Sequence, residues 1–175
     1  MNLKILKDFA SLHSIDWRIL YAILMTESNA EGFDEKGKIK QRFESGIFSG
    51  FTKVKNGDSP KHPALPGLDP KWIKQRDDHE LLLMSYSYGI AQIMGWQYPY
   101  IGYRSIYDMV MDYEESEDNQ VKNFCLFCQN YRDGRFLKAL QELNYRLIAN
   151  MYNGAAFERN RYDEKLKHFF NQAKL

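Results

Sequence analysis

The sequence predicts a single domain, residues 1 to 175, that is mainly α-helical with one small β excursion near its N-terminus. Apolar residues recur at helical spacing through most of the chain, whereas one short segment alternates apolar and polar residues as a strand does. Four of the five prolines fall within residues 52 to 70, which predicts a surface loop there. The 44% hydrophobic content is ample for one compact core.

The first elements are predicted from apolar spacing and capping residues. Residues 3 to 12 have the pattern of a short amphipathic helix. A second helix begins with Ser14 as its N-cap, has Asp16 in its first turn and ends at Glu27-Ser28-Asn29. Residues 39 to 44 then alternate, which indicates a short strand or hairpin.

After the proline-rich segment the helical period returns. Ser105 and Asp108 form a capping-box pattern, Gly134 separates two helical segments, and Asn153-Gly154 stops another. The predicted helices lie near residues 71–84, 86–94, 105–115, 118–131, 135–142, 145–152 and 162–172.

Charge argues against several classes of partner. The chain has 24 basic and 23 acidic side chains, so it has no general affinity for nucleic acid or an anionic membrane. Residues 36 to 76 are basic and residues 112 to 118 are acidic. A solvated face is the favoured interpretation of the basic region, and contact with an anionic wall polymer is the alternative.

Metal binding and membrane insertion are not expected. Cys125 and Cys128 have the spacing of buried thiols on one helix face, and the four histidines are scattered without ligand spacing. No apolar stretch approaches about 18 residues. Lys7 and Asp8 interrupt any signal-peptide apolar region, so we expect no signal peptide and an export route supplied by another protein.

Glu27 is the strongest catalytic candidate. It closes the apolar run from Ile19 to Met25, where a buried core gives way to a loop. Burial and the negative end of a helix both favour the protonated carboxyl group, so Glu27 is expected to be a general acid. Cleavage of a glycosidic bond requires such a proton donor and a second group across the bond.

Glu44 is the leading candidate for that second group. It shares a predicted strand face with Lys40 and Arg42, which should keep its carboxylate ionised, and two carboxyl groups with opposed pKa shifts suggest an acid and a base. Asp34 is the competing candidate, because it also follows the second helix within loop reach. The sequence leaves both possibilities open.

Two later segments offer groups suited to a sugar. Gly89 permits close approach of a ligand, Gln92 offers an amide donor and acceptor, and Ser87 and Tyr88 add hydroxyl groups and a flat face. The phenol of Tyr152, at the end of an apolar helix, is expected to point into a cleft and to hydrogen-bond a carboxyl group.

These segments resemble the motifs of a known superfamily. Glu27-Ser28, the segment from Ser87 to Gly95, and Tyr152-Asn153-Gly154 look like the Glu-Ser, Gly-Leu-Met-Gln and Tyr-Asn motifs of lysozyme-like proteins, including lytic transglycosylases. The N-acetylmuramidase family of phage endolysins is more similar still, from about residue 15 to residue 172. The similarity of this chain to that family includes Arg42-Phe43-Glu44 and Tyr162-Asp163-x-Lys165-Leu166.

The resemblance implies a lysozyme-like α+β fold with a β-hairpin after the catalytic helix, and peptidoglycan glycan strands as substrate. It implies that Glu27 is the catalytic acid and, through the shared motifs, that Tyr152 is catalytic and Ser28, Gln92 and Asn153 bind substrate. Hydrolysis by a muramidase is favoured. The alternatives are a lytic transglycosylase, which forms anhydro ends, and a non-catalytic wall-binding module.

The expected enzyme is a monomer that needs no cofactor and no metal. It would act on the bacterial wall either as a phage lysin released through a membrane hole or as a secreted effector. The effector would have a cognate inhibitor or immunity protein.

Overall fold

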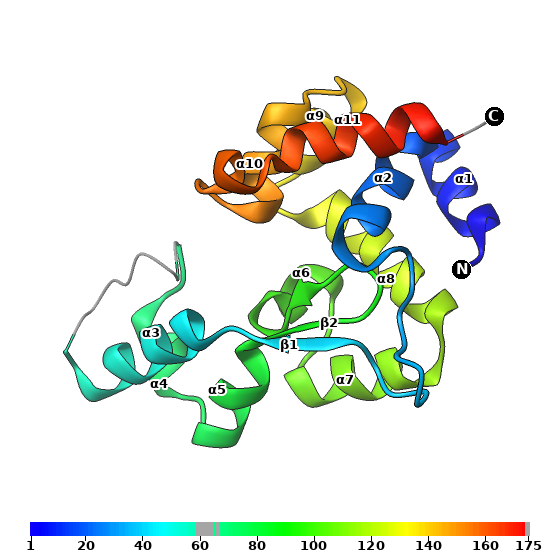
Figure 1. Cartoon of the computed structure of the whole chain (residues 1–175). Coiled ribbons are helices and arrows are strands. Elements are labelled where there is room, and N and C mark those ends of the chain that lie inside the picture. Colours follow the sequence, from blue (N-terminus) through cyan, green and yellow to red (C-terminus); the bar gives the residue numbers. More distant parts are fainter. Residues whose placement is uncertain (59–64, 66, 174–175) are drawn as a thin grey trace.

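The computed structural model describes residues 1–58, 65 and 67–173. Most of these residues are helical, and a small three-stranded sheet lies in the lower half of the view in Figure 1. The eleven α-helices among the described residues are α1 Leu3–Leu12, α2 Trp17–Ser28, α3 Ser45–Asn56, α4 Pro70–Lys74, α5 Asp78–Met84, α6 Tyr98–Ile101, α7 Ile106–Glu115, α8 Glu117–Asn130, α9 Arg135–Gln141, α10 Tyr145–Asn153 and α11 Tyr162–Gln172. Two short 3₁₀ helices cover Gly95–Gln97 and Phe157–Asn160.

The three strands come from two distant parts of the chain. They are β1 Gln41–Phe43, β2 Tyr86–Tyr88 and β3 Ile93–Met94, in antiparallel order β1-β2-β3. Arg42 lies opposite Ser87, and Ser87 lies opposite Met94. The segment after α2 makes a short turn closed by an antiparallel bridge between Phe33 and Ile39, which is the small hairpin expected there. It then continues into β1, which forms one edge of the sheet beside the β2–β3 hairpin.

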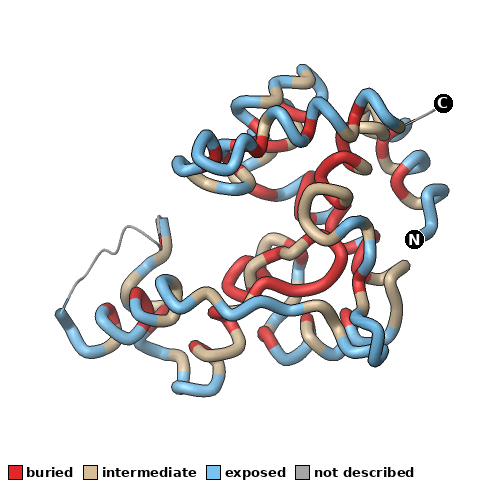
Figure 2. The backbone as a smooth tube through the Cα atoms, in the orientation of Figure 1, coloured by how far each residue is buried: buried red, intermediate tan, exposed pale blue. Residues whose placement is uncertain are grey.

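The helices form two groups on either side of α2 and α8. Helices α9, α10 and α11 lie at the top of Figure 1, and α3, α4, α5 and α7 surround the sheet below. Helix α2 packs against α11 and α1, and α8 contacts α1, α6, α7 and α9. Figure 2 shows buried backbone along α2 and through the β2–β3 hairpin, and the hydrophobic core extends from there into both groups of helices.

Helix α2 explains why Glu27 lies at the edge of this core. Ile19, Leu20, Ile23 and Leu24 are fully buried in its first three turns. The helix ends because Asn29 adopts a left-handed conformation, with φ of 61°, which Asn tolerates better than most residues. Glu27 therefore occupies the last helical turn.

The predicted start of this helix was wrong. Asp16 is the N-cap, and its carboxylate accepts a hydrogen bond from the backbone N–H of Arg18. Ser14 lies outside the helix with φ of 54°, in the turn after α1. Asp and Ser are comparable caps, so composition alone did not separate the two positions.

The predicted helix over residues 86–94 was also wrong, because this segment is the β2–β3 hairpin. Gly89 has φ of 69° and Gln92 has φ of 47°, so both turn residues are left-handed. A side-chain carbon on Gly89 would lie 2.6 Å from the Gln120 Oε1 atom, which leaves room only for glycine. The turn is thus tightly packed against α8, where Gln120 is fully buried.

Other boundaries differ from the predictions in the region around the prolines. Helix α3 extends to Asn56, inside the predicted loop, and the rest of that loop lies partly outside the described residues. Helix α3 forms because Phe51 and Val54 bury one stripe, and Gly57 ends it with φ of 85°. The predicted helix 71–84 is two helices, because Asp77 starts α5 with a capping box. The short helices at 95–97 and 98–101 were not predicted.

The remaining helices confirm the predictions. Helices α1 and α7 to α11 occupy the expected segments, and Ser105 and Asp108 form the predicted capping box. Cys125 and Cys128 are buried thiols on α8. None of the helices within residues 1–58 and 67–173 combines the length and apolar character needed to cross a membrane.

Candidate active site

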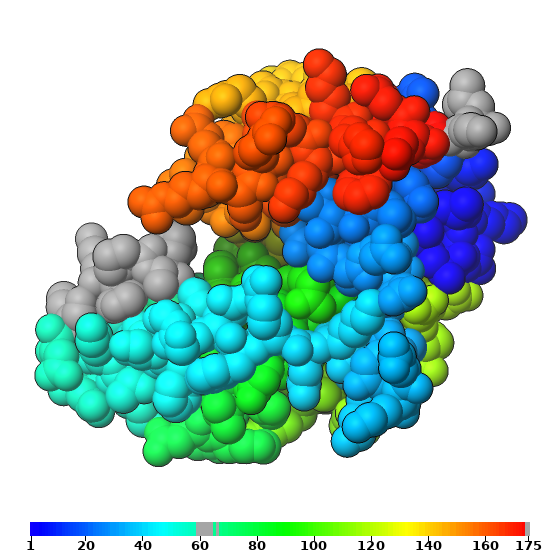
Figure 3. Space-filling view, in the orientation of Figure 1, coloured from blue at the N-terminus to red at the C-terminus, as the bar shows by residue number. Residues whose placement is uncertain are grey.

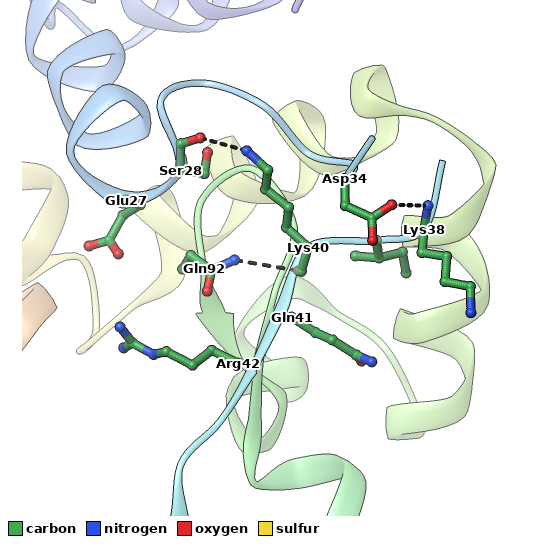
Figure 4. Close-up of a pocket in the computed structure, with 9 residues that line it drawn as sticks. Glu27, Ser28, Asp34, Lys38, Lys40, Gln41, Arg42 and Gln92 are labelled. Atoms are coloured by element: carbon green, nitrogen blue, oxygen red, sulfur yellow. Dashed lines mark hydrogen bonds between the residues drawn. The ribbon is translucent and has the colours of Figure 1, made fainter. Parts of the chain in front are cut away.

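A pocket of about 480 Å³ lies between the end of α2 and β1 (Figure 4). In the space-filling view of Figure 3 the surface is hollowed between β1 and α3 on one side and α10 and α11 on the other. The described residues that line the pocket are Glu27, Ser28, Asp34, Lys38, Ile39, Lys40, Gln41, Arg42 and Gln92.

Glu27 is half-buried at one end of this pocket, and among the described residues its carboxyl group has one hydrogen-bond partner. The Tyr162 hydroxyl, at the start of α11, donates a hydrogen bond to Glu27 Oε1. Burial in an apolar setting disfavours the carboxylate and raises the pKa of Glu27 to about 7. The Tyr162 hydrogen bond opposes this increase because it stabilises the carboxylate. Glu27 therefore keeps a substantial protonated fraction near neutral pH.

Charged groups on three segments act on the Glu27 carboxyl group. The cations of Arg42 on β1 and Lys165 on α11 lower its pKa, and the Glu44 carboxylate raises it. In Figure 4 the Arg42 guanidinium extends toward Glu27. None of these influences exceeds that of burial, so the net shift remains upward.

The structure corrects the expected partner of this carboxyl group. The Tyr152 hydroxyl donates to the carbonyl oxygen of Ala91 at 2.5 Å and is not bonded to Glu27. The Tyr152 ring stacks on the Tyr162 ring, with centroids 6.4 Å apart. Tyr152 thus joins α10 to the hairpin and supports Tyr162. Sequence reasoning missed Tyr162 as the partner, although it begins the last of the motifs that carry the resemblance.

Gln92 lies at the centre of the pocket, where neighbouring groups fix its amide. Its Oε1 accepts from the Ser87 hydroxyl at 2.8 Å, and its Nε2 donates to the Gly89 carbonyl oxygen at 2.9 Å. Ser87 is 2% exposed, so it holds Gln92 rather than facing the pocket. Tyr88 is also buried, and its hydroxyl donates to the Leu83 carbonyl oxygen. The expectation that Tyr88 presents a face to a sugar was wrong, because that side chain belongs to the core.

Ser28 fastens the end of α2 to the hairpin. Its hydroxyl donates to the Ile90 carbonyl oxygen at 2.6 Å and accepts from the Glu31 backbone N–H. The Lys40 ammonium donates to the Ser28 carbonyl oxygen at 3.1 Å and pairs with Glu31 at 2.6 Å. These contacts set the distance between Glu27 and Gln92 across the pocket.

A carboxyl group that is half-buried, hydrogen-bonded and held beside a polar pocket has the form of a glycosidase acid. A sequence model of the N-acetylmuramidase family, described as Muramidase, matches residues 16–174. The chain belongs to the N-acetylmuramidase family. It is therefore a glycoside hydrolase, a muramidase that acts on peptidoglycan of the bacterial cell wall.

A solved structure has the same fold. The crystal structure of Burkholderia AP3 phage endolysin matches this muramidase with a TM-score of 0.72 and 24% sequence identity. The match covers 98% of this chain and 71% of that chain. No curated protein matches the chain by sequence. The mainly α-helical fold with a small antiparallel sheet, expected from the sequence, is thus confirmed, and it resembles the fold of this phage endolysin.

The two candidate second carboxylates of the muramidase differ in their surroundings. Glu44 follows β1 directly, and its carboxylate pairs with the Arg42 Nε at 2.6 Å. Glu44 is not among the described residues that line the pocket, although its charge acts on Glu27. Asp34 lines the pocket but lies at the opposite end from Glu27 in Figure 4. Its Oδ1 accepts from the backbone N–H groups of Lys36 and Lys38, which makes it a turn residue.

A second hollow of about 520 Å³ continues the muramidase pocket beyond Gln92, which lines both. Asn153 lies in this second hollow, at the end of α10, and its Oδ1 accepts from Asn160 Nδ2. The remaining described residues that line it include Ile93, Met94, Trp96, Phe127, Tyr131, Arg132 and Met151. The two hollows share Gln92 and together form a groove. Within the described residues, no group of three or more potential metal ligands occurs.

Proposed function

We propose that the enzyme hydrolyses the β-1,4 bond between N-acetylmuramic acid and N-acetylglucosamine, with Glu27 as general acid. The Glu27 carboxyl group gives its proton to the bridging oxygen as the bond from that oxygen to the anomeric carbon breaks. Water then adds to the anomeric carbon and releases a proton. The pKa of about 7 is the observation that supports this role, because an acid must hold its proton near working pH.

Tyr162 supports the proposal by occupying one oxygen of that carboxyl group. Burial raises the pKa of Tyr162 well above its usual value, so its phenol remains a hydrogen-bond donor at physiological pH. Because it donates to Glu27 Oε1, the acidic proton belongs on Oε2. Tyr162 is thus a positioning residue, and Tyr152 positions it in turn through ring stacking.

Glu44 is proposed as the second carboxylate, which stabilises the cationic transition state or accepts the proton of water. Its carboxylate pairs with Arg42 Nε at 2.6 Å, and its charge acts on the Glu27 carboxyl group. Gln92, Ser28 and Asn153 are proposed to contact the glycan, since all three line the groove. Ser87 acts through Gln92.

Replacement of each candidate carboxylate by its amide separates Glu44 from Asp34. We expect Glu44→Gln to lower kcat by about a hundredfold, as loss of a base does. Asp34→Asn is the matched control, because an amide oxygen still accepts the two turn hydrogen bonds, and it should keep near wild-type activity. Rates of peptidoglycan solubilisation measure both. A large loss in Asp34→Asn with an active Glu44→Gln would reverse the assignment.

The reaction products test hydrolysis directly. The alternatives are a lytic transglycosylase, in which the muramic 6-hydroxyl replaces water, and a wall-binding module without turnover. Mass spectrometry of muropeptides released by the wild type should show reducing muramic acid ends. Anhydro ends would establish the transglycosylase reaction. If no muropeptide were released, the protein would be a wall-binding module without turnover.

We further propose that the chain acts as a single-domain monomer. It would reach the wall either through a phage-made membrane pore or by a secretion machine. In the second case a cognate inhibitor protein would protect the producing cell. Size-exclusion chromatography with light scattering tests the monomer.

A further inference from the structure

The groove does not end at Asn153 but continues to Arg132, in the turn between α8 and α9. Arg132 lines the second hollow and also a third hollow of about 300 Å³, and Trp96 and Tyr131 line both as well. Shared lining residues thus connect the pocket at Glu27 to Arg132, through Gln92 between the first and second hollows. The proposed reaction uses no residue at this far end.

Arg132 is held in place by its neighbours. Its guanidinium carbon lies 5.4 Å from the centre of the Tyr131 ring, and the Tyr131 ring stacks on Phe127 at 4.5 Å. Arg132 and Asp133 have φ of 53° and 56°, followed by Gly134 at 77°. Two successive left-handed residues other than glycine are costly, so packing must maintain this turn. The cation is thus presented in a defined position.

The second hollow beside Arg132 is lined by apolar side chains and by the uncharged amides of Gln92, Gln97, Asn150 and Asn153. Among the described residues that line the second hollow, Arg132 is the one with a charged side chain. Ile93, Met94 and Met151 contribute the apolar surface. None of the ion pairs among the described residues includes Arg132. The adjacent Asp133 lines the third hollow and not the second. A cation in such a position is suited to an anionic ligand group.

We propose that Arg132 binds a carboxylate on the lactyl substituent of a muramyl residue, while the sugar ring lies over the apolar surface of the second hollow. The inference rests on the proposed function, because the same groove must hold the glycan. The sugar rings of the glycan are uncharged. Its carboxylates lie on the lactyl groups or on the peptide stems attached to them. The guanidinium fork matches a carboxylate with two parallel hydrogen bonds. Two sources offer this chemistry, the lactyl carboxylate of a stem-free residue and the carboxylates of an attached peptide stem.

Binding without turnover tests the site. In a Glu27→Gln background, affinity is measured by calorimetry for three ligands: a chito-oligosaccharide with no carboxylate, a stem-free peptidoglycan oligosaccharide, and one with peptide stems. We expect Arg132→Gln to weaken binding of a carboxylate-bearing ligand by about tenfold, the usual size of a charge-assisted hydrogen bond. Binding of the chito-oligosaccharide should be unchanged. The ligand whose affinity falls identifies whether the bound carboxylate belongs to the peptide stem or to the lactyl group.

The matched control is Arg104→Gln, at an exposed arginine that does not line either hollow. It should alter none of the three affinities. Equal weakening of all three ligands by Arg132→Gln, or no weakening of any, would overturn the proposal. Release of products by the Glu27→Gln background would instead contradict the acid assignment, so the two failures are distinguishable.

Discussion

Glu27→Gln should lower the rate of peptidoglycan cleavage by about a thousandfold or more, the size expected when a general acid is lost at a poor leaving group. The amide cannot donate the proton that the bridging oxygen needs. Its oxygen can still accept the Tyr162 hydrogen bond, so the local structure should be retained. Muropeptide release from purified walls, followed over time, measures the loss.

Two further measurements make this result decisive. Circular dichroism and thermal unfolding should show that the variant is folded, and pull-down on insoluble peptidoglycan should show that it still binds. A variant that is folded, bound and inactive supports the acid role. Activity within a few-fold of the wild type would instead show that another residue is the general acid.

Helix α2 was predictable from sequence because its signals are local. The apolar run before Glu27 and the stop at Asn29 lie within one helix, and both appear as expected. The same reasoning failed for residues 86–94. Ile90, Ile93 and Met94 have helical spacing, but two left-handed turn residues and pairing with β1 produce a hairpin. Residues 41–43 and 86–88 are far apart in the chain, so their pairing leaves no pattern in a short stretch of sequence.

The partner of Glu27 was unpredictable for a related reason. Tyr162 is 135 residues from Glu27, and only the packing of α11 on α2 brings them together. Tyr152 looked equally suitable, since it also follows an apolar helix. The orientation of its hydroxyl toward Ala91 depends on the hairpin that was read as a helix. The hydrogen bond to Glu27 was therefore predicted for Tyr152, whereas the structure gives it to Tyr162.

The unusual pKa of Glu27 should also make the enzyme less stable as pH rises. The carboxyl group has a pKa of 4.5 in the unfolded chain and about 7 in the folded protein. Between these values the folded state keeps a proton that the unfolded state releases, so the free energy of unfolding falls with increasing pH. Each pH unit is worth about 1.4 kcal/mol, which gives a loss of about 3 kcal/mol by pH 8.

Glu27→Gln isolates this contribution, because an amide does not titrate while all other groups remain. The stability of the variant relative to the wild type should be constant below pH 4.5 and increase by about 3 kcal/mol between pH 4.5 and 7. Urea unfolding at several pH values measures the difference. Two curves that run parallel from pH 4 to pH 8 would show that the folded protein does not hold this proton.

Tyr162→Phe provides the complementary control. Its hydroxyl stabilises the Glu27 carboxylate, and removal of that hydrogen bond should raise the pKa of Glu27 further. The fall in stability should then extend to higher pH than in the wild type, and the alkaline limb of activity should move in the same direction. A tyrosine that served packing alone would leave both pH profiles in place, because phenylalanine keeps the ring that stacks on Tyr152.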